Sequence, residues 1–265
     1  MQPDYISLNR ESWNKRTSHH INSEFYDLPG FLAGQTSLKH PELELLGSVA
    51  GKSILHLQCH FGQDTLSLGR MGAQVTGVDL SDEAIRYAGE LAGKCGVPAR
   101  FICCDLYDLP RHLDEQFDMV FTSYGTIGWL PDMDRWAGIV ARYLKPGGTF
   151  LFVDFHPVVW MFDDNFKEVG YDYFNTGPIV EQESGTYADR NAPIQGQYVG
   201  WNHHMSEVIQ ALLGQGLQLE LLKEYDHSPY NVFRDTVEYE PGRFRIGHLP
   251  HLIPMLYAIR AVKKG

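Results

Sequence analysis

The sequence predicts an α/β fold built around a parallel sheet, and two observations indicate it. Between residues 53 and 154, short apolar runs alternate with segments that have the pattern of helices. This alternation is typical of parallel strands joined by right-handed crossovers. The runs ILHL, VTGV, MVF and FLFV are almost continuously apolar, as the strands of a buried parallel sheet should be.

The first elements follow from local signals. Residues 1–50 are expected to form a helical cap in which Trp13 is an anchor. A strand at 53–57 leads through a turn at Gly62 into a helix, which Gly72 should end because glycine suits a left-handed C-terminal cap. We expect this helix to bury Leu66, Leu68 and Met71.

The next elements repeat this order. After a strand at 74–78, Ser81 occupies the N-cap position of a helix that extends to about residue 94. Asp132 begins a later helix. The remaining strands of the core are predicted at 100–104, 117–122 and 149–154. Residues 51–156 would thus form one α/β unit.

The pattern then changes. Residues 157–202 are rich in aromatic side chains and lack a clear period. A long irregular segment inside a compact domain is usually a lid or a binding element. Residues 203–265 are predicted to return to the core with a helix and two last strands, at 217–225 and 254–262.

Composition limits the function classes. The chain has 265 residues and a formal net charge of -11, which disfavours nucleic acid as a partner. Its longest apolar stretch is broken by polar residues and is too short to span a bilayer, so no membrane partner is expected. The first residues lack the apolar run of a secretion signal, and the four cysteines form no CxxC pair. We therefore expect a cytoplasmic protein with reduced thiols and no bound metal.

The segment from Lys52 to Asp79 has the layout of a nucleoside-cofactor site. It contains an apolar strand, a turn with Gly62, a helix, and a second strand that ends in Asp79. Glycine at a strand-to-helix turn lets a ligand approach the backbone closely. A carboxylate about 20 residues further on can accept hydrogen bonds from the two hydroxyls of a ribose.

Five segments extend this pattern into a family resemblance. In order, they read ILHLQCHFG, VTGVDLS, FICCDLYDLP, FDMVFTSYG and YLKPGGTFLFVDFHP. With this spacing, residues 51–154 resemble the class I S-adenosylmethionine-dependent methyltransferases, of the type that acts on small molecules. The resemblance implies a three-layer Rossmann-like sandwich with a seven-stranded, mostly parallel sheet whose last strand is antiparallel. It also implies an N-terminal helical cap, a lid insertion after the fifth strand, and S-adenosylmethionine as the cofactor.

The resemblance implies roles for individual residues. Asp79 would bind the ribose and Leu80 would lie against the adenine, while Asp105 and the backbone of Leu106 would bind the adenine edge. The other implied cofactor residues are Trp13, Leu57, Gln58, His60, Phe61, Gly62 and Ser123. Tyr124, Trp129 and Trp160 are candidate walls of the acceptor pocket, although core packing explains such aromatic residues equally well. His156 is a candidate general base, with a structural role in the turn before Pro157 as the alternative.

One departure from the family leaves two interpretations open. The family's first turn reads Asp-x-Gly-x-Gly-x-Gly, whereas this chain has His56, Gln58, His60 and Gly62. The turn could still bind the cofactor, with its polar side chains reaching the amino-acid end. Alternatively, the protein could be a non-catalytic S-adenosylmethionine or S-adenosylhomocysteine binder. A nicotinamide dehydrogenase is disfavoured, because a pyrophosphate loop needs several glycines.

The sequence also bears on the methyl acceptor and on the oligomeric state. Residues 158–200 hold seven acidic against two basic residues, together with many aromatic side chains. This favours a small neutral or cationic acceptor of aromatic or amphipathic character. We expect a monomer or a homodimer.

Overall fold

A computed structural model describes residues 4–174 and 177–265. Its centre is a seven-stranded sheet in the order β3-β2-β1-β4-β5-β11-β8. The first five strands pair in parallel, and β11 runs antiparallel to both β5 and β8, which confirms the predicted fold. The strands are β1 (Ser53–Leu57), β2 (Gln74–Asp79), β3 (Ala99–Cys103), β4 (Phe117–Ser123), β5 (Leu144–Phe155), β8 (Leu217–Tyr225) and β11 (Leu256–Lys263).

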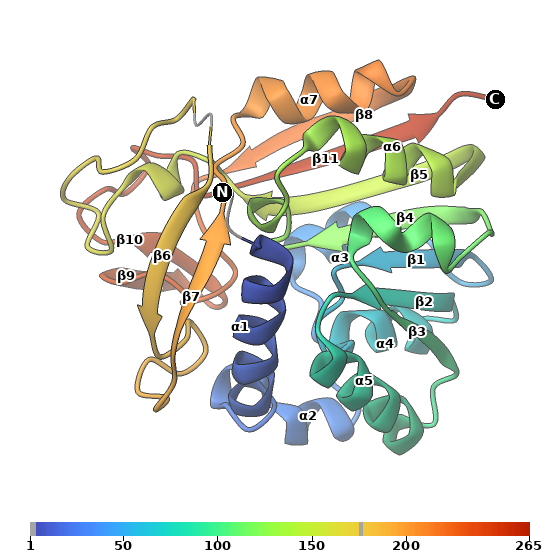
Figure 1. The fold of residues 1–265 in the computed structure, drawn as a ribbon, viewed down its shortest axis with the longest axis horizontal. Helices are drawn as coiled ribbons and strands as arrows, with labels where there is room; N and C mark the ends of the chain where they lie inside the picture. The colour runs from blue at the N-terminus through green and yellow to red at the C-terminus, as the bar shows by residue number, and fades with distance from the viewer. Residues whose placement is uncertain (1–3, 175–176) are drawn as a thin grey trace.

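Helices cover both faces of this sheet (Figure 1). On one face, α6 (Met133–Tyr143) and α7 (Met205–Gly214) pack around a core that includes Trp136 and Val208. On the other face, α3 (His40–Leu46) and α4 (Gln63–Arg70) contribute Leu45 and Leu68 to a second core. The remaining helices are α1 (Tyr5–His20), α2 (Leu28–Leu32) and α5 (Asp82–Cys95), with short 3-10 turns at η1 (Glu24–Tyr26), η2 (Leu106–Arg111), η3 (Ile127–Trp129) and η4 (Val159–Met161).

The insertion after β5 is more regular than predicted. Its strands β6 (Ile179–Ser184) and β7 (Gln195–Gly200) form an antiparallel hairpin that stands beside α1, apart from the main sheet (Figure 1). The exposure of successive side chains in β6 alternates, so the period-2 pattern of a half-buried strand is present in IVEQES. The surrounding aromatic residues obscure this short pattern in the sequence. A second hairpin joins β9 (Thr236–Glu240) and β10 (Arg243–Ile246).

Three contacts connect the β6–β7 hairpin to the N-terminal cap. The side chain of Asn9 donates to the carbonyl of Val199 and accepts from its N–H, each over 2.9 Å. The hydroxyls of Tyr26 and Tyr187 lie 2.5 Å apart. Arg16 of α1 forms an ion pair with Glu183 of β6. The cap and the hairpin therefore form one cover.

The predicted burial of Met71 was wrong. Met71 does not point into the core: it is 39% exposed, because α4 ends at Arg70 and Met71 is its C-cap residue. The predicted N-cap at Ser81 is present, with the Ser81 hydroxyl accepting from the N–H of Ala84 over 3.0 Å.

Among residues 4–174 and 177–265, no helix is long and apolar enough to cross a membrane.

Candidate functional site

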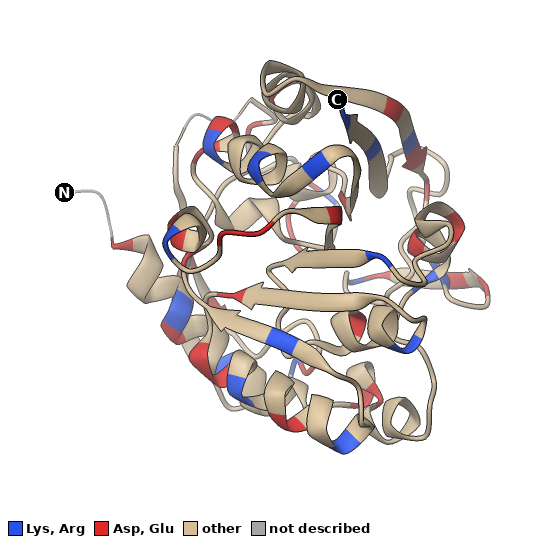
Figure 2. Cartoon of the chain, turned by 90° about the vertical axis from the view of Figure 1, so that its right-hand side faces the viewer, with Lys and Arg blue, Asp and Glu red and all other residues tan. Residues whose placement is uncertain are grey.

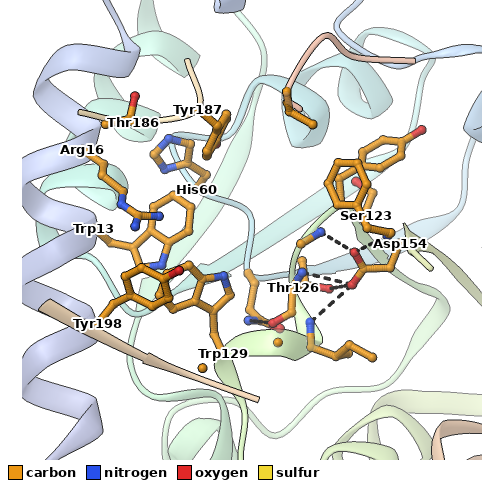
Figure 3. A pocket seen from close by; sticks show the side chains of 18 of the residues that line it. Trp13, Arg16, His60, Ser123, Thr126, Trp129, Asp154, Thr186, Tyr187 and Tyr198 are labelled. Atoms are coloured by element: carbon orange, nitrogen blue, oxygen red, sulfur yellow. Dashed lines mark hydrogen bonds between the residues drawn. The ribbon is translucent and has the colours of Figure 1, made fainter. Parts of the chain in front are cut away.

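A cavity of about 880 Å³ lies at the carboxyl ends of the parallel strands. The sheet forms its floor, and residues of α1, of the β6–β7 hairpin and of the loop after β5 line its walls. Strand order reverses between β1 and β4 at this edge. Open α/β sheets bind their ligands at such a point. Figure 3 shows part of the lining.

Asp79 is the best-defined polar group in this cavity. One of its carboxylate oxygens accepts the N–H of His60 and the other accepts the N–H of Ser81, both over 2.8 Å. These bonds fix the orientation of the carboxylate and leave each oxygen with a second lone pair. Burial raises the pKa of Asp79 to about 6, although the backbone N–H groups act to lower it. Further hydrogen-bond donors from a ligand would therefore stabilise its ionised form.

The turn after β1, Gln58–Gly62, follows the path of a glycine-rich turn although it has only one glycine. The φ angles of Gln58, His60 and Gly62 are 55°, 50° and 82°, in the left-handed region that favours glycine. Each substituted side chain is held by a hydrogen bond. Gln58 donates to the carbonyl of Thr126 over 2.8 Å, and a ring nitrogen of His60 lies 2.9 Å from one of His20. Side-chain contacts thus hold a backbone that glycine would adopt without strain.

His60 lies among aromatic rings. Its ring centroid is 5.1 Å from that of Trp13 and 5.6 Å from that of Tyr26. Burial lowers the pKa of His60 to about 3, and the positive charge of Arg16 contributes to this shift. Both effects keep the imidazole neutral at physiological pH.

Arg16 occupies an aromatic cage at one end of the cavity. Its guanidinium lies 5.1 Å from the ring centroids of Trp13 and Trp129 and 5.3 Å from that of Tyr198 (Figure 3). These distances suit cation–π attraction. Because Arg16 also pairs with Glu183, the cage joins the cap, the β4–α6 connection and the hairpin into a single wall.

At the far edge of the site, Asp105 follows β3. Its carboxylate accepts the N–H of Tyr107 over 2.9 Å and caps the short η2 turn. Burial raises the pKa of this carboxyl group. Leu80 and Leu106 line the cavity beside it. A hydrogen-bond acceptor and two apolar side chains therefore meet there, and this combination suits a flat heterocyclic ring with polar groups at its edge.

A buried carboxylate at the end of β5 shapes the loop after β4. Asp154 accepts backbone N–H groups from Gly125, Thr126 and Ile127 (Figure 3). These bonds hold the loop in which Tyr124 adopts a φ of 52°. The Tyr124 hydroxyl points away from the cavity, since it donates to Glu42 over 2.5 Å. Asp154 was not among the predicted site residues, although an acid at the end of an apolar strand was a usable signal.

The structure brings most of the predicted site residues to one cavity. The predicted residues that line it are Trp13, Gln58, His60, Phe61, Gly62, Asp79, Leu80, Asp105, Leu106, Ser123, Tyr124, Trp129 and Trp160. Leu57 does not, because its side chain is completely buried in the core of the sheet.

His156 also lies outside the lining. One ring nitrogen is 3.0 Å from a carboxylate oxygen of Glu224, and the other accepts the N–H of Val158 over 3.2 Å. With both nitrogens engaged away from the cavity, His156 has the structural role that was its alternative, and we correct its assignment as a base.

Several lining residues had no signal in the sequence. Arg16, Tyr26 and Asp64 come from the cap and from the first turn of α4, while Tyr187, Tyr198 and Tyr230 come from the insertion and the C-terminal connection. Their meeting depends on how distant segments pack, which local patterns do not encode. Only the abundance of aromatic residues in the insertion pointed toward them.

Comparisons with known proteins agree with this geometry. Residues 54–148 match the family model described as a methyltransferase domain. An uncharacterized methyltransferase of Synechocystis sp. is 35% identical over 134 residues, which cover 49% of this chain and 60% of the relative. A ubiquinone biosynthesis O-methyltransferase of Chromobacterium violaceum is 32% identical over 105 residues, or 40% of this chain and 45% of the relative. The chain thus spans about half the length of the curated relatives that it matches.

A solved structure extends the likeness to the whole fold. The S-adenosylmethionine-dependent methyltransferase of Mesorhizobium loti superimposes with a TM-score of 0.56, covering 88% of this chain and 100% of its own, at 20% identity. Residues 54–148 are therefore similar to the methyltransferase domain family, and the chain has the fold of a class I S-adenosylmethionine-dependent methyltransferase.

Proposed function

We propose that this protein is a methyltransferase that uses S-adenosylmethionine to methylate a small-molecule acceptor. The observation that carries the proposal is Asp79. It ends β2, lines the cavity, and has both oxygens oriented by backbone N–H groups while a lone pair on each stays available. This is the acceptor pair that the two hydroxyls of a ribose need.

The order of the strands supports a proposed arrangement for the rest of the cofactor. Asp105 lies beyond β3, on one side of Asp79, and the turn Gln58–Gly62 lies beyond β1, on the other side. With the ribose at Asp79, the adenine would lie against Leu80 and Leu106, and the amino-acid end would lie along the turn.

The residues of this chain act by positioning. The sulfonium of the cofactor supplies an already activated methyl group, so the protein needs no nucleophile of its own. Good alignment of acceptor and methyl group can lower the barrier by roughly 7–11 kcal/mol. The cap and the β6–β7 hairpin cover the cavity through the contacts of Asn9, Arg16 and Tyr26, which would exclude water during transfer.

The walls of the cavity favour an aromatic or amphipathic acceptor. Trp13, Trp129 and Tyr198 form one wall, and Tyr124 and Trp160 line another part of the cavity. Aromatic walls of this kind bind flat apolar groups well. The acidic residues of the insertion add a preference for neutral or cationic molecules over polyanions.

Nucleic acid is not part of the proposal. The formal net charge is -11, and in Figure 2 the blue Lys and Arg positions are interspersed with red Asp and Glu positions along the ribbon. A phosphate backbone would need a continuous basic surface. We also propose a cytoplasmic protein that works as a monomer or a homodimer, as the sequence predicts.

A second candidate function is cofactor binding without turnover. The side chains of Gln58 and His60, which stand where the family has glycines, favour it. Calorimetry with S-adenosylmethionine and S-adenosylhomocysteine, followed by mass spectrometry of a panel of phenols, amines and thiols, separates the two. Binding with methylated product supports the enzyme, and binding without product across the panel supports the sensor. If neither compound binds, both proposals fail.

A further inference from the structure

One lobe of the cavity lies away from the groups that the proposed cofactor uses. Phe155 is the last residue of β5, and β1 and β4 separate this strand from β2, which ends in Asp79. Beside Phe155, the lining includes Trp160 of η4 together with Phe166 and Phe233 of the connecting loops. We call these four residues the aromatic lobe. The whole cavity, at about 880 Å³, is near the upper end of the range of about 300–1,000 Å³ for ligand pockets, which leaves room for an acceptor beside the cofactor.

The rings of the aromatic lobe form one continuous apolar surface. The ring centroid of Phe233 lies 5.2 Å from that of Phe155 and 5.4 Å from that of Phe166. Trp160 completes the lobe, at 5.6 Å from both Phe155 and Phe233. The three phenylalanine rings are buried, whereas Trp160 is 43% exposed. An exposed indole beside buried rings offers a free apolar face to a ligand.

Charged side chains at the rim of the lobe make contacts within the protein. Arg190 of the insertion donates to the carbonyls of Val232 and Phe233 over 3.3 and 2.8 Å, and these bonds hold the segment that carries Phe233. Arg234 lies 3.5 Å from Asp164. A ligand group in the lobe would therefore meet aromatic carbon, and burial of a charge there would be costly unless it were paired. The lobe thus favours an uncharged group.

The other aromatic cluster of the cavity, the cage, is less available to a ligand. Its rings at Trp13 and Trp129 each lie 5.1 Å from the guanidinium of Arg16, which also pairs with Glu183. Part of the ring surface of the cage is therefore already covered by a side chain of the protein. A flat group would find free ring surface in the aromatic lobe without displacing Arg16.

Tyr124 connects the aromatic lobe with the part of the cavity near the proposed cofactor. Its ring centroid is 6.0 Å from that of Phe155, and it lines the cavity directly after β4, which lies between β1 and β5 in the sheet. A molecule with one end in the lobe can thus extend past Tyr124 toward the turn Gln58–Gly62, along which the amino-acid end of the cofactor would lie.

We propose that the aromatic lobe binds an uncharged aromatic ring of the acceptor, remote from the atom that is methylated. The acceptor would then be a molecule of two parts, with a reacting group near the cofactor and an aryl group held by Trp160 and Phe233. Contacts between rings and removal of the aryl group from water would supply the affinity. This inference rests on the proposed function and narrows its class of acceptor.

The test uses matched pairs of compounds that differ by one phenyl ring: phenol and 4-phenylphenol, and benzylamine and 4-phenylbenzylamine. Isothermal titration calorimetry would measure each compound with protein saturated with S-adenosylhomocysteine. In both pairs, the extra ring should increase the affinity for the wild type by about tenfold to a hundredfold, the gain expected from moving one phenyl group out of water. In Trp160→Ala this gain should largely disappear. The affinity of that variant for S-adenosylhomocysteine should be unchanged, because Trp160 lies beyond β5, away from Asp79.

Two further variants separate this effect from a general loss of aromatic surface or of folding. Phe174→Ala is the matched control and should keep the full gain, since the Phe174 ring is 68% exposed and lies outside the lining. Phe233→Leu keeps an apolar side chain in the core but removes the ring, so it should reduce the gain in both pairs. Thermal unfolding would show whether each variant is folded, and the large exposure of Trp160 predicts little change in Trp160→Ala.

The outcomes are distinct. A gain in both pairs that is lost in Trp160→Ala and reduced in Phe233→Leu supports the proposal. If the wild type shows no gain, or a gain in one pair alone, or if the gain persists in either variant, the proposal is overturned, and intact binding of S-adenosylhomocysteine then leaves the proposed function standing. A wild-type protein that does not bind S-adenosylhomocysteine overturns the proposed function and, with it, this inference.

Discussion

The backbone N–H of His60 donates to the carboxylate of Asp79 over 2.8 Å. The end of β2 thus holds the turn that follows β1, and the group proposed to bind the ribose also orients the turn proposed to hold the cofactor tail. Binding of the ribose and binding of the cofactor tail would then both depend on the carboxylate of Asp79.

Replacing Asp79 with alanine should weaken S-adenosylhomocysteine binding. Loss of hydrogen bonds to a charged group is expected to cost about 1.5–3 kcal/mol, and release of the turn adds to this. Calorimetry would measure the change, with Asp114→Ala on the surface as the control. Wild-type affinity in Asp79→Ala would show that the ribose assignment is wrong.

The affinity should also depend on pH in a defined direction. Burial raises the pKa of Asp79 to about 6, and the hydroxyls of a ribose would favour the ionised form and lower this pKa in the complex. Binding should then be strongest above pH 6 and weaken as the pH falls through 6, by up to about tenfold per pH unit. His60, with a pKa of about 3, stays neutral over this range.

Titrations between about pH 5 and pH 8 would check this dependence. In Asp79→Asn the profile should flatten, because the titrating group is gone. A profile with the same slope in that variant would assign the pH dependence to another group, such as Asp105, whose pKa burial also raises.

Gly62 should tolerate no side chain. Its φ is 82°, and a Cβ atom there would lie 2.9 Å from the ring of Phe101 and 3.1 Å from the Cβ of Ala88. Gly96, at the end of α5, has a φ of 63°, but a Cβ atom there would have no other atom within 4 Å. Both alanine variants therefore share the backbone strain, and only Gly62→Ala adds a steric clash.

Urea unfolding of the two variants would separate these effects. We expect Gly96→Ala to lower the free energy of unfolding by about 1–2 kcal/mol, from the left-handed backbone alone. Gly62→Ala should lower it by about 1–3 kcal/mol more, from overpacking. Equal losses in the two variants would mean that Phe101 moves aside without cost.

The sheet was well predicted because its signals are local. The runs at β1, β2 and β4 are apolar and bounded by turn residues, and the Ser81 cap follows from its spacing to the next helix. Helix ends were harder to place, as Met71 illustrates. The β6–β7 hairpin was not predicted, because its stability depends on contacts with α1 that no local pattern within the insertion encodes.

The site residues also divide into those that local sequence signals predict and those whose positions depend on tertiary packing. Asp79, Asp105 and Gly62 lie at strand ends and turns, where parallel topology alone brings them together. The position of Arg16 depends on the packing of the cap against the sheet, so no local sequence pattern groups it with them. His156 shows the opposite error: it follows a strand end closely, yet its ring turns toward Glu224, a direction that sequence position does not determine.

Asn9 should control how firmly the hairpin covers the cavity. Its side chain is 2% exposed and satisfies both backbone groups of Val199, which is itself fully buried. In Asn9→Ala, that N–H and C=O would be left buried without partners, at a cost of about 1–3 kcal/mol each. The hairpin should therefore open more often.

Hydrogen exchange would detect this opening as faster exchange in residues 195–200, and stopped-flow displacement should show faster release of S-adenosylhomocysteine. Asn22→Ala is a suitable control, since the side chain of Asn22 donates only to the carbonyl of Ser18, at an exposed position. If exchange in the hairpin is unchanged in Asn9→Ala while Val199 loses its partner, the Arg16–Glu183 pair and the Tyr26–Tyr187 contact would suffice to hold the cover closed.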